Sequence, residues 1–139
     1  MKFRNPILTG LAVMSFGMMV GASPPATPPA SAKTYKSVPR SIRGYYISKR
    51  AHEALAISSK HVVEAWPLAD AYQSTVTKVK NSGHKYSIRA YIMLGGRNYT
   101  TYKLSHYAHN RLASGGYSFQ KVSKHTYSKF LNSWKYVRG

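Results

Sequence analysis

The alternation of apolar and polar residues from Lys85 to Leu94 constrains the fold of this chain more than any other feature of the sequence. Successive side chains of a β-strand point to opposite faces, so this pattern predicts a strand with one apolar and one mixed face. Gly95-Gly96 follows at once and favours a tight reversal into a second strand at 99–104. We therefore expect a β-hairpin over residues 85–104.

Short runs rich in strand-forming residues recur along the rest of the chain, separated by Gly, Pro, Ser and Asn. A helix at 48–56 is the one rival element, since Ala and Glu raise helical propensity there. Seven to nine short strands predict an all-β, single-domain fold, either an antiparallel barrel or a sandwich. The other expected strands are 45–47, 54–57, 62–66, 72–79, 106–112 and 117–122, with a last strand or short helix at 126–134.

The N-terminal region has the three parts of a signal peptide. Lys2 and Arg4 precede a helix-forming apolar stretch at 7–22, and a Pro/Ala/Ser segment follows at 23–32. Small residues before the cut predict a signal peptide at 1–32, and a cut after 22 is the alternative, leaving 23–32 as a Pro-rich spacer. Beyond it we expect a basic lead segment at 33–43 and a β-rich domain at 44–139.

The composition is strongly basic and lacks cysteine. The chain has 21 lysines and arginines against three acidic residues, and a formal net charge of +18. Residues 71–139 contain no acidic residue. Charge of this density favours polyanionic partners, while the absence of cysteine excludes a disulfide scaffold and a thiolate metal site.

The sequence offers few parts for catalysis. Glu53, Glu64 and Asp70 are the only carboxylate side chains, and no nucleophile elbow is present. Glu64 alternates with Val62, so we expect it to point inward. His106 and His109 lie three residues apart, a spacing that places them on opposite faces of a strand. We predict a protein that is not an enzyme and that has no cofactor, metal ligand or catalytic residue.

Tyrosines interleave with lysines and arginines in the second half of the chain. Planar rings can stack on sugars or bases, and cations can pair with phosphate oxygens. A tyrosine such as Tyr86 can instead pack inside with its hydroxyl at the rim. We predict polyanion binding by Lys78, Lys80, Lys85, Arg89, Arg97, Lys103 and Arg111, and stacking by Tyr91, Tyr99, Tyr102 and Tyr107.

The segment Pro-Arg-Ser-Ile-Arg-Gly-Tyr-Tyr at 39–46 resembles the start of the first strand in small exported lipocalin-like proteins of Gram-positive bacteria. The resemblance implies an up-and-down barrel in which Gly44 permits a close approach of the backbone. It also implies that an aromatic side chain closes one end. Tyr46 stands here where a lipocalin Gly-x-Trp motif has tryptophan.

These features predict a secreted or cell-wall-associated binding module for anionic, teichoic-acid-like envelope polymers. Nucleic acid ranks below such polymers as a partner. Two alternatives stay open, namely a lipocalin-like carrier of a small apolar or amphipathic ligand and a secreted enzyme of unknown class. No transmembrane span is expected after the signal is removed.

Overall fold

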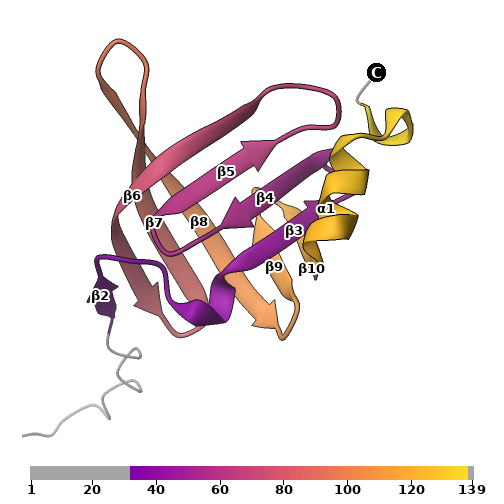
Figure 1. Cartoon of the computed structure of the whole chain (residues 1–139). Coiled ribbons are helices and arrows are strands. Elements are labelled where there is room, and N and C mark those ends of the chain that lie inside the picture. Colours follow the sequence, from indigo (N-terminus) through magenta and orange to yellow (C-terminus); the bar gives the residue numbers. More distant parts are fainter. Residues whose placement is uncertain (1–31, 138–139) are drawn as a thin grey trace, which may run out of the picture.

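The computed structural model describes residues 32–137, and residues 1–31 of the predicted signal peptide lie outside them. The chain forms β-strands with one short helix after the last strand (Figure 1). No helix within residues 32–137 is long and apolar enough to cross a membrane. The elements are β2 (Lys33–Tyr35), the 3-10 turn η2 (Arg40–Ile42), β3 (Gly44–Ser48), β4 (Glu53–Ile57), β5 (His61–Ala65), β6 (Ala71–Ser82), β7 (Lys85–Met93), β8 (Arg97–Ala108), β9 (Arg111–Ser114), β10 (Tyr117–Val122), α1 (Lys124–Leu131) and η3 (Trp134–Tyr136).

The strands β3 to β10 close into an eight-stranded antiparallel barrel. Each strand pairs with the next along the chain, and β10 pairs with β3, with Lys121 opposite Tyr46. Closure removes the exposed strand edges that a sandwich would leave. The short strand β2 lies outside this ring and pairs with the last part of β6. The all-β prediction is confirmed, and the barrel is the correct alternative of the two.

Two predicted element boundaries are wrong. Residues 99–104 and 106–112 were expected to form separate strands, but β8 runs unbroken to Ala108 and β9 begins only at Arg111. The polar residues near His106 do not end β8, because the backbone N–H of His106 still donates to the carbonyl of His84 at 2.8 Å. The rival helix at 48–56 is also absent, since Glu53–Ile57 forms β4.

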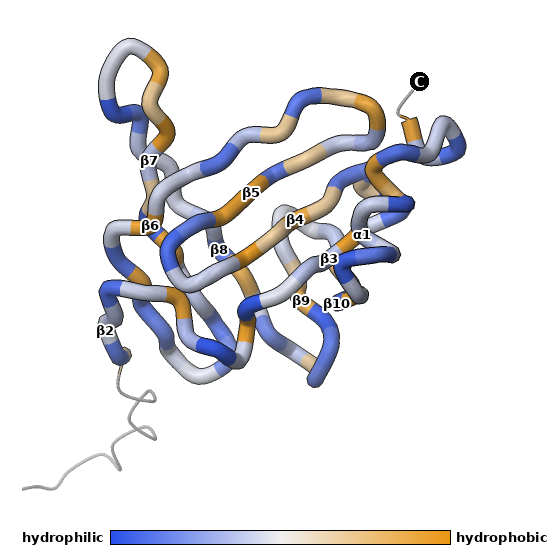
Figure 2. The backbone as a smooth tube through the Cα atoms, viewed as in Figure 1, coloured by the Kyte–Doolittle hydropathy of each residue, from blue (hydrophilic) through white to orange (hydrophobic). Residues whose placement is uncertain are grey.

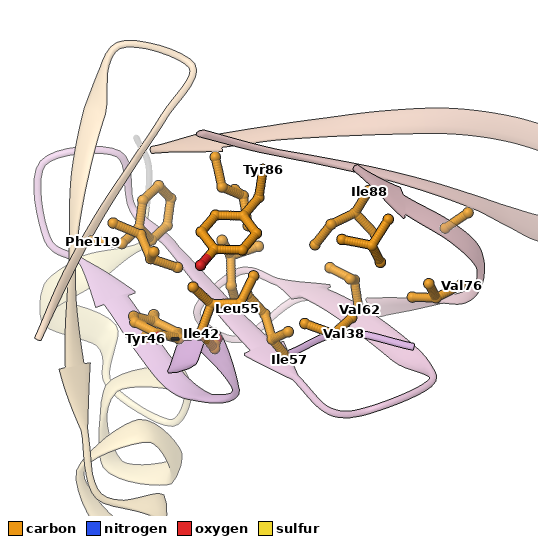
Figure 3. Packing of buried hydrophobic residues seen from close by; sticks show 14 of the residues in the cluster. Val38, Ile42, Tyr46, Leu55, Ile57, Val62, Val76, Tyr86, Ile88 and Phe119 are labelled. Carbon is orange, nitrogen blue, oxygen red and sulfur yellow. Dashed lines mark hydrogen bonds between the residues drawn. The ribbon is translucent and has the colours of Figure 1, made fainter. Parts of the chain in front are cut away.

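Alternate residues of the strands fill the barrel (Figure 3). The largest fully buried side chains include Tyr46, Phe119 and Ile88. Figure 2 shows the corresponding alternation of hydrophobic and hydrophilic segments along the strands. Ile42 of η2 is fully buried in the same cluster, and the Tyr46 hydroxyl donates to its carbonyl oxygen at 3.0 Å. The turn η2 and Tyr46 therefore close one end of the barrel together.

A second apolar cluster lies on the outside of the barrel, under α1. Phe130 of α1 is buried against Ile47 of β3 and Ala54 of β4. The helix begins because the Ser123 side chain accepts a hydrogen bond from the backbone N–H of Thr126, which satisfies an otherwise free donor. The segment predicted as a last strand or short helix at 126–134 is thus a helix that covers β3.

Candidate functional site

The register of β6, β7 and β8 places the predicted basic residues on one side of the sheet. Lys78 pairs with Arg89, and Ser87 lies between Lys80 and Lys103 in one cross-strand row. The intervening rows contain buried residues such as Ile88, which face the core. Because paired residues of neighbouring strands point to the same face, the basic rows face outward.

We call this outward surface the basic face. Its six basic side chains are exposed, and the Tyr91–Tyr99 pair lies among them in the same register. Arg111 is exposed on the next strand, β9, and points outward because its neighbour Leu112 is fully buried. The basic face consists of Lys78, Lys80, Lys85, Arg89, Arg97 and Lys103 with Tyr91 and Tyr99.

Two arginines stack on the two tyrosines of this face. The guanidinium carbon of Arg89 lies 4.5 Å from the ring centroid of Tyr99, and that of Arg97 lies 4.4 Å from the centroid of Tyr91. The two tyrosine rings lie 5.7 Å apart with planes inclined at 59°. Hydrogen bonding to Tyr99, followed by the electrostatic effect of Tyr91, raises the pKa of Arg97. The contacts favour positions of both guanidinium groups beside the rings while leaving them charged.

A hollow of about 550 Å³ lies at the end of β7 and β8 that is away from their connecting turn. Lys80, Lys85 and Lys103 line it, so three of the predicted cations share one concave surface. The rest of the lining is mostly small: Ala32, Ser82, Ser87, Ser105, Ala113, Ser114, Gly115 and Gly116, with Tyr86 and Leu104. Lysine ammonium groups and serine hydroxyls can both donate hydrogen bonds to an anion.

The sequence reasoning missed the small residues that make this hollow. Ser87, Ser105 and Ala113 occupy outward positions on three neighbouring strands, where larger side chains would fill the space. The signal for them was one small residue two positions after a basic residue on each of the three strands. Their adjacency could be recognised only once the strand register was known.

Tyr102 is not part of the basic face. It pairs with the buried Ile88, points into the barrel, and its hydroxyl lies 3.0 Å from that of Ser74. Burial, and then a hydrogen bond with Glu64, raises the pKa of Tyr102. The prediction that Tyr102 is a stacking residue on the surface is therefore wrong. Tyr107 does lie exposed on β8, with its hydroxyl hydrogen-bonded to that of Ser118 on β10.

The acidic side chains lie away from the basic face. Glu64 shares its row with the buried Leu55, so it points inward as expected, and its partner is the phenol of Tyr102. Glu53 lies opposite the buried Ser48 and also acts electrostatically on Tyr102. Asp70 is exposed on the loop before β6. Among residues 32–137, no three histidine or acidic side chains come together as a metal site would require.

Fold and register define the chain as a closed antiparallel barrel compatible with the lipocalin-like class, carrying a basic, tyrosine-containing outer face. Comparison with known proteins adds no relative: no family model, no curated protein and no solved structure matches this chain.

Proposed function

We propose that this protein is a non-enzymatic binding module whose basic face associates with anionic polymers of the cell envelope. The observation that carries the proposal is the register, which brings six predicted cations to one outward face. Residues 71–139 supply this face and contain no acidic side chain. A charge concentration of this kind attracts a polyanion and raises its rate of association.

The arrangement suits an extended polymer with repeating phosphates. Side chains on one face of a strand recur about every 7 Å, so the face presents its cations in rows rather than as one point charge. Lysines and arginines both pair with phosphate, and the tyrosine rings offer flat surfaces for sugar units. We therefore place teichoic-acid-like polymers first among the partners and nucleic acid second.

The proposal includes export, with the protein secreted or held at the cell wall. It rests on the signal-like N-terminal sequence and on the resemblance to exported lipocalin-like proteins of Gram-positive bacteria. The Arg43-Gly44 segment of that resemblance begins the barrel: the Nε of Arg43 donates to the carbonyl of Val38 at 2.8 Å. Gly44 has a φ of +143°, a conformation that favours glycine.

The described residues bear on the carrier alternative in two ways. Tyr46, Phe119 and Ile42 are fully buried and fill one end of the interior. The 550 Å³ hollow exposes mainly apolar surface beside its three lysines, so it suits an amphipathic anion better than a wholly apolar ligand. Binding to the outer face therefore accounts better for the charge of this chain than transport of an apolar molecule.

Two triple variants of equal net charge test the proposal. In the face variant, Lys80, Lys85 and Lys103 become glutamine. In the matched control, glutamine replaces Lys49, Lys129 and Lys135, which line a separate hollow beside α1. The probe is a poly(glycerol phosphate) polymer, with neutral dextran as the blank, titrated calorimetrically at about 50 mM and about 0.5 M salt.

The face variant is expected to bind the polymer about 10- to 100-fold more weakly, since each cation at an anionic surface contributes on the order of 1 kcal/mol. The affinity of the control variant for the polymer is expected to fall about threefold or less. High salt should weaken polymer binding by the unaltered protein and by both variants. Equal losses in the two variants would show that net charge alone causes binding. Absence of binding by the unaltered protein at low salt would refute the proposal.

A further inference from the structure

The β7–β8 hairpin extends beyond the other loops of the barrel (Figure 1). Its turn carries the apolar residues Met93 and Leu94. Met93 is 63% exposed and Leu94 is 65% exposed, and Figure 2 shows hydrophobic segments at this far end. The turn is well defined: the backbone N–H of Leu94 donates to the carbonyl of Gly96 at 2.9 Å. The Nδ2 of Asn98 donates to the carbonyl of Leu94 at 3.0 Å. The hairpin thus holds two apolar side chains in solvent on an ordered turn.

The residues behind the tip change character in a fixed order. Met93 lies opposite Arg97, the next outward row contains Tyr91 and Tyr99, and the row after that contains Arg89. Since a strand rises about 3.4 Å per residue, Leu94 and Arg89 lie roughly 17 Å apart along the hairpin. Arg97 belongs to the tip row, but its guanidinium carbon lies 4.4 Å from the ring centroid of Tyr91. The apolar tip is therefore followed by a level at which aromatic rings and cations lie together.

This order matches the depth profile of a bilayer surface. Hydrocarbon accepts apolar side chains, the boundary with water favours tyrosine rings, and anionic headgroups attract lysine and arginine. Long arginine side chains can also reach the phosphates while their aliphatic stems stay in an apolar layer. The guanidinium groups of Arg89 and Arg97 are already stacked on the two tyrosines at this level.

We propose that the tip of the β7–β8 hairpin inserts into the surface of an anionic lipid bilayer. Met93 and Leu94 enter the acyl layer, Tyr91 and Tyr99 lie at the boundary, and Arg89 and Arg97 contact lipid phosphates. The charge of the hairpin selects this partner over an uncharged apolar surface. The inference rests in part on the proposed function, because both use the basic face, so its test must separate the tip from the lysines.

The absence of cysteine permits a direct measurement. A single Leu94→Cys substitution carries an environment-sensitive dye at one site only. The matched control is Leu68→Cys, at a side chain that is 44% exposed in the loop between β5 and β6. The barrel and both apolar clusters lie within residues 32–137, so the chain beginning at Lys33 is used. Dye emission is recorded with phosphatidylglycerol vesicles and with phosphatidylcholine vesicles.

Dye at position 94 should shift to shorter wavelength with phosphatidylglycerol vesicles and not with phosphatidylcholine vesicles, while dye at position 68 stays unchanged in both. An unshifted dye at position 94, or equal shifts at the two positions, would overturn the inference. A shift at position 94 with phosphatidylcholine alone would also contradict it, because the charges of the hairpin would then play no part.

A tip variant separates this inference from the proposed function. Met93→Ser combined with Leu94→Ser should weaken binding to phosphatidylglycerol vesicles about tenfold or more, because it removes two large apolar side chains. The same variant should bind poly(glycerol phosphate) within about twofold of the unaltered protein. Undiminished vesicle binding would rule out insertion and leave polymer binding standing. If the unaltered protein does not bind the polymer but the dye at position 94 shifts with phosphatidylglycerol vesicles, the proposed function is refuted and insertion of the tip stands.

Discussion

Tyr46 connects the interior of the barrel to the turn that closes it. Its side chain is 1% exposed, and its hydroxyl donates to the carbonyl of Ile42. Burial raises the pKa of Tyr46 from its ordinary value of 10.0 to about 12, because the charged phenolate would lose its hydration. The sequence resemblance predicted an aromatic closing one end at this position, and the structure places Tyr46 there.

The raised pKa of Tyr46 predicts alkaline destabilisation. Above pH 10 the unfolded chain loses the phenolic proton while the folded chain keeps it, so the free energy of unfolding falls as pH rises towards 12. The slope from this group is about 1.4 kcal/mol per pH unit. Tyr46→Phe should reduce that slope and cost about 1 kcal/mol at neutral pH through the lost hydrogen bond. Urea unfolding at several pH values measures both effects, and an unchanged alkaline slope in the variant would contradict them.

Gly44 is a second position where one residue decides the local backbone. Its φ of +143° is unfavourable for other residues, and an added Cβ would lie 2.6 Å from the Cε of Lys121. The lysine side chain can move aside, but the backbone conformation cannot relax without shifting the start of β3. Gly44→Ala should therefore lower the free energy of unfolding by about 1–3 kcal/mol. Gly83→Ala, where nothing lies within 4 Å of the added Cβ, provides the comparison at another positive φ, and a larger loss there would refute the role of Gly44.

At the scale of elements, the sequence predicted β7 and its glycine turn closely. The alternation from Tyr86 to Ile92 is local, so the pleat can be read directly from the chain. The length of β8 could not be read in this way, because its last residues lie beyond the register with β7 and are held by the carbonyl of His84 and by pairing with β9. The residues that form the basic face could be named individually. Their gathering on one face depended on a register that spans three strands.

The helix α1 provides a prediction at this scale. Phe130 is 3% exposed and is the buried residue of α1 that packs on Ile47 and Ala54. Phe130→Ala should destabilise the docking of the helix by about 3 kcal/mol, since a buried aromatic contact is replaced by a gap. Amide hydrogen exchange should quicken in α1 and change little in β6–β8. Equal acceleration in β6–β8 would show that helix and barrel unfold as one unit.

At the scale of the whole molecule, charge is distributed unevenly. Glu53 and Glu64 face the interior on β4 and β5, whereas the outer surface of β6–β8 contains only basic and neutral residues. Mutual repulsion of like charges destabilises a compact chain, and a bound polyanion relieves it. We infer that polymer binding should also raise the thermal stability of the protein.

The measurement that tests the central claim most directly is an amide chemical-shift titration of the isotopically labelled protein with poly(glycerol phosphate). We predict that the largest shifts map to β6, β7 and β8, centred on Lys80, Arg89 and Lys103, and that they disappear at high salt. Shifts that spread evenly over all basic residues, or that centre on α1, would contradict a dedicated basic face.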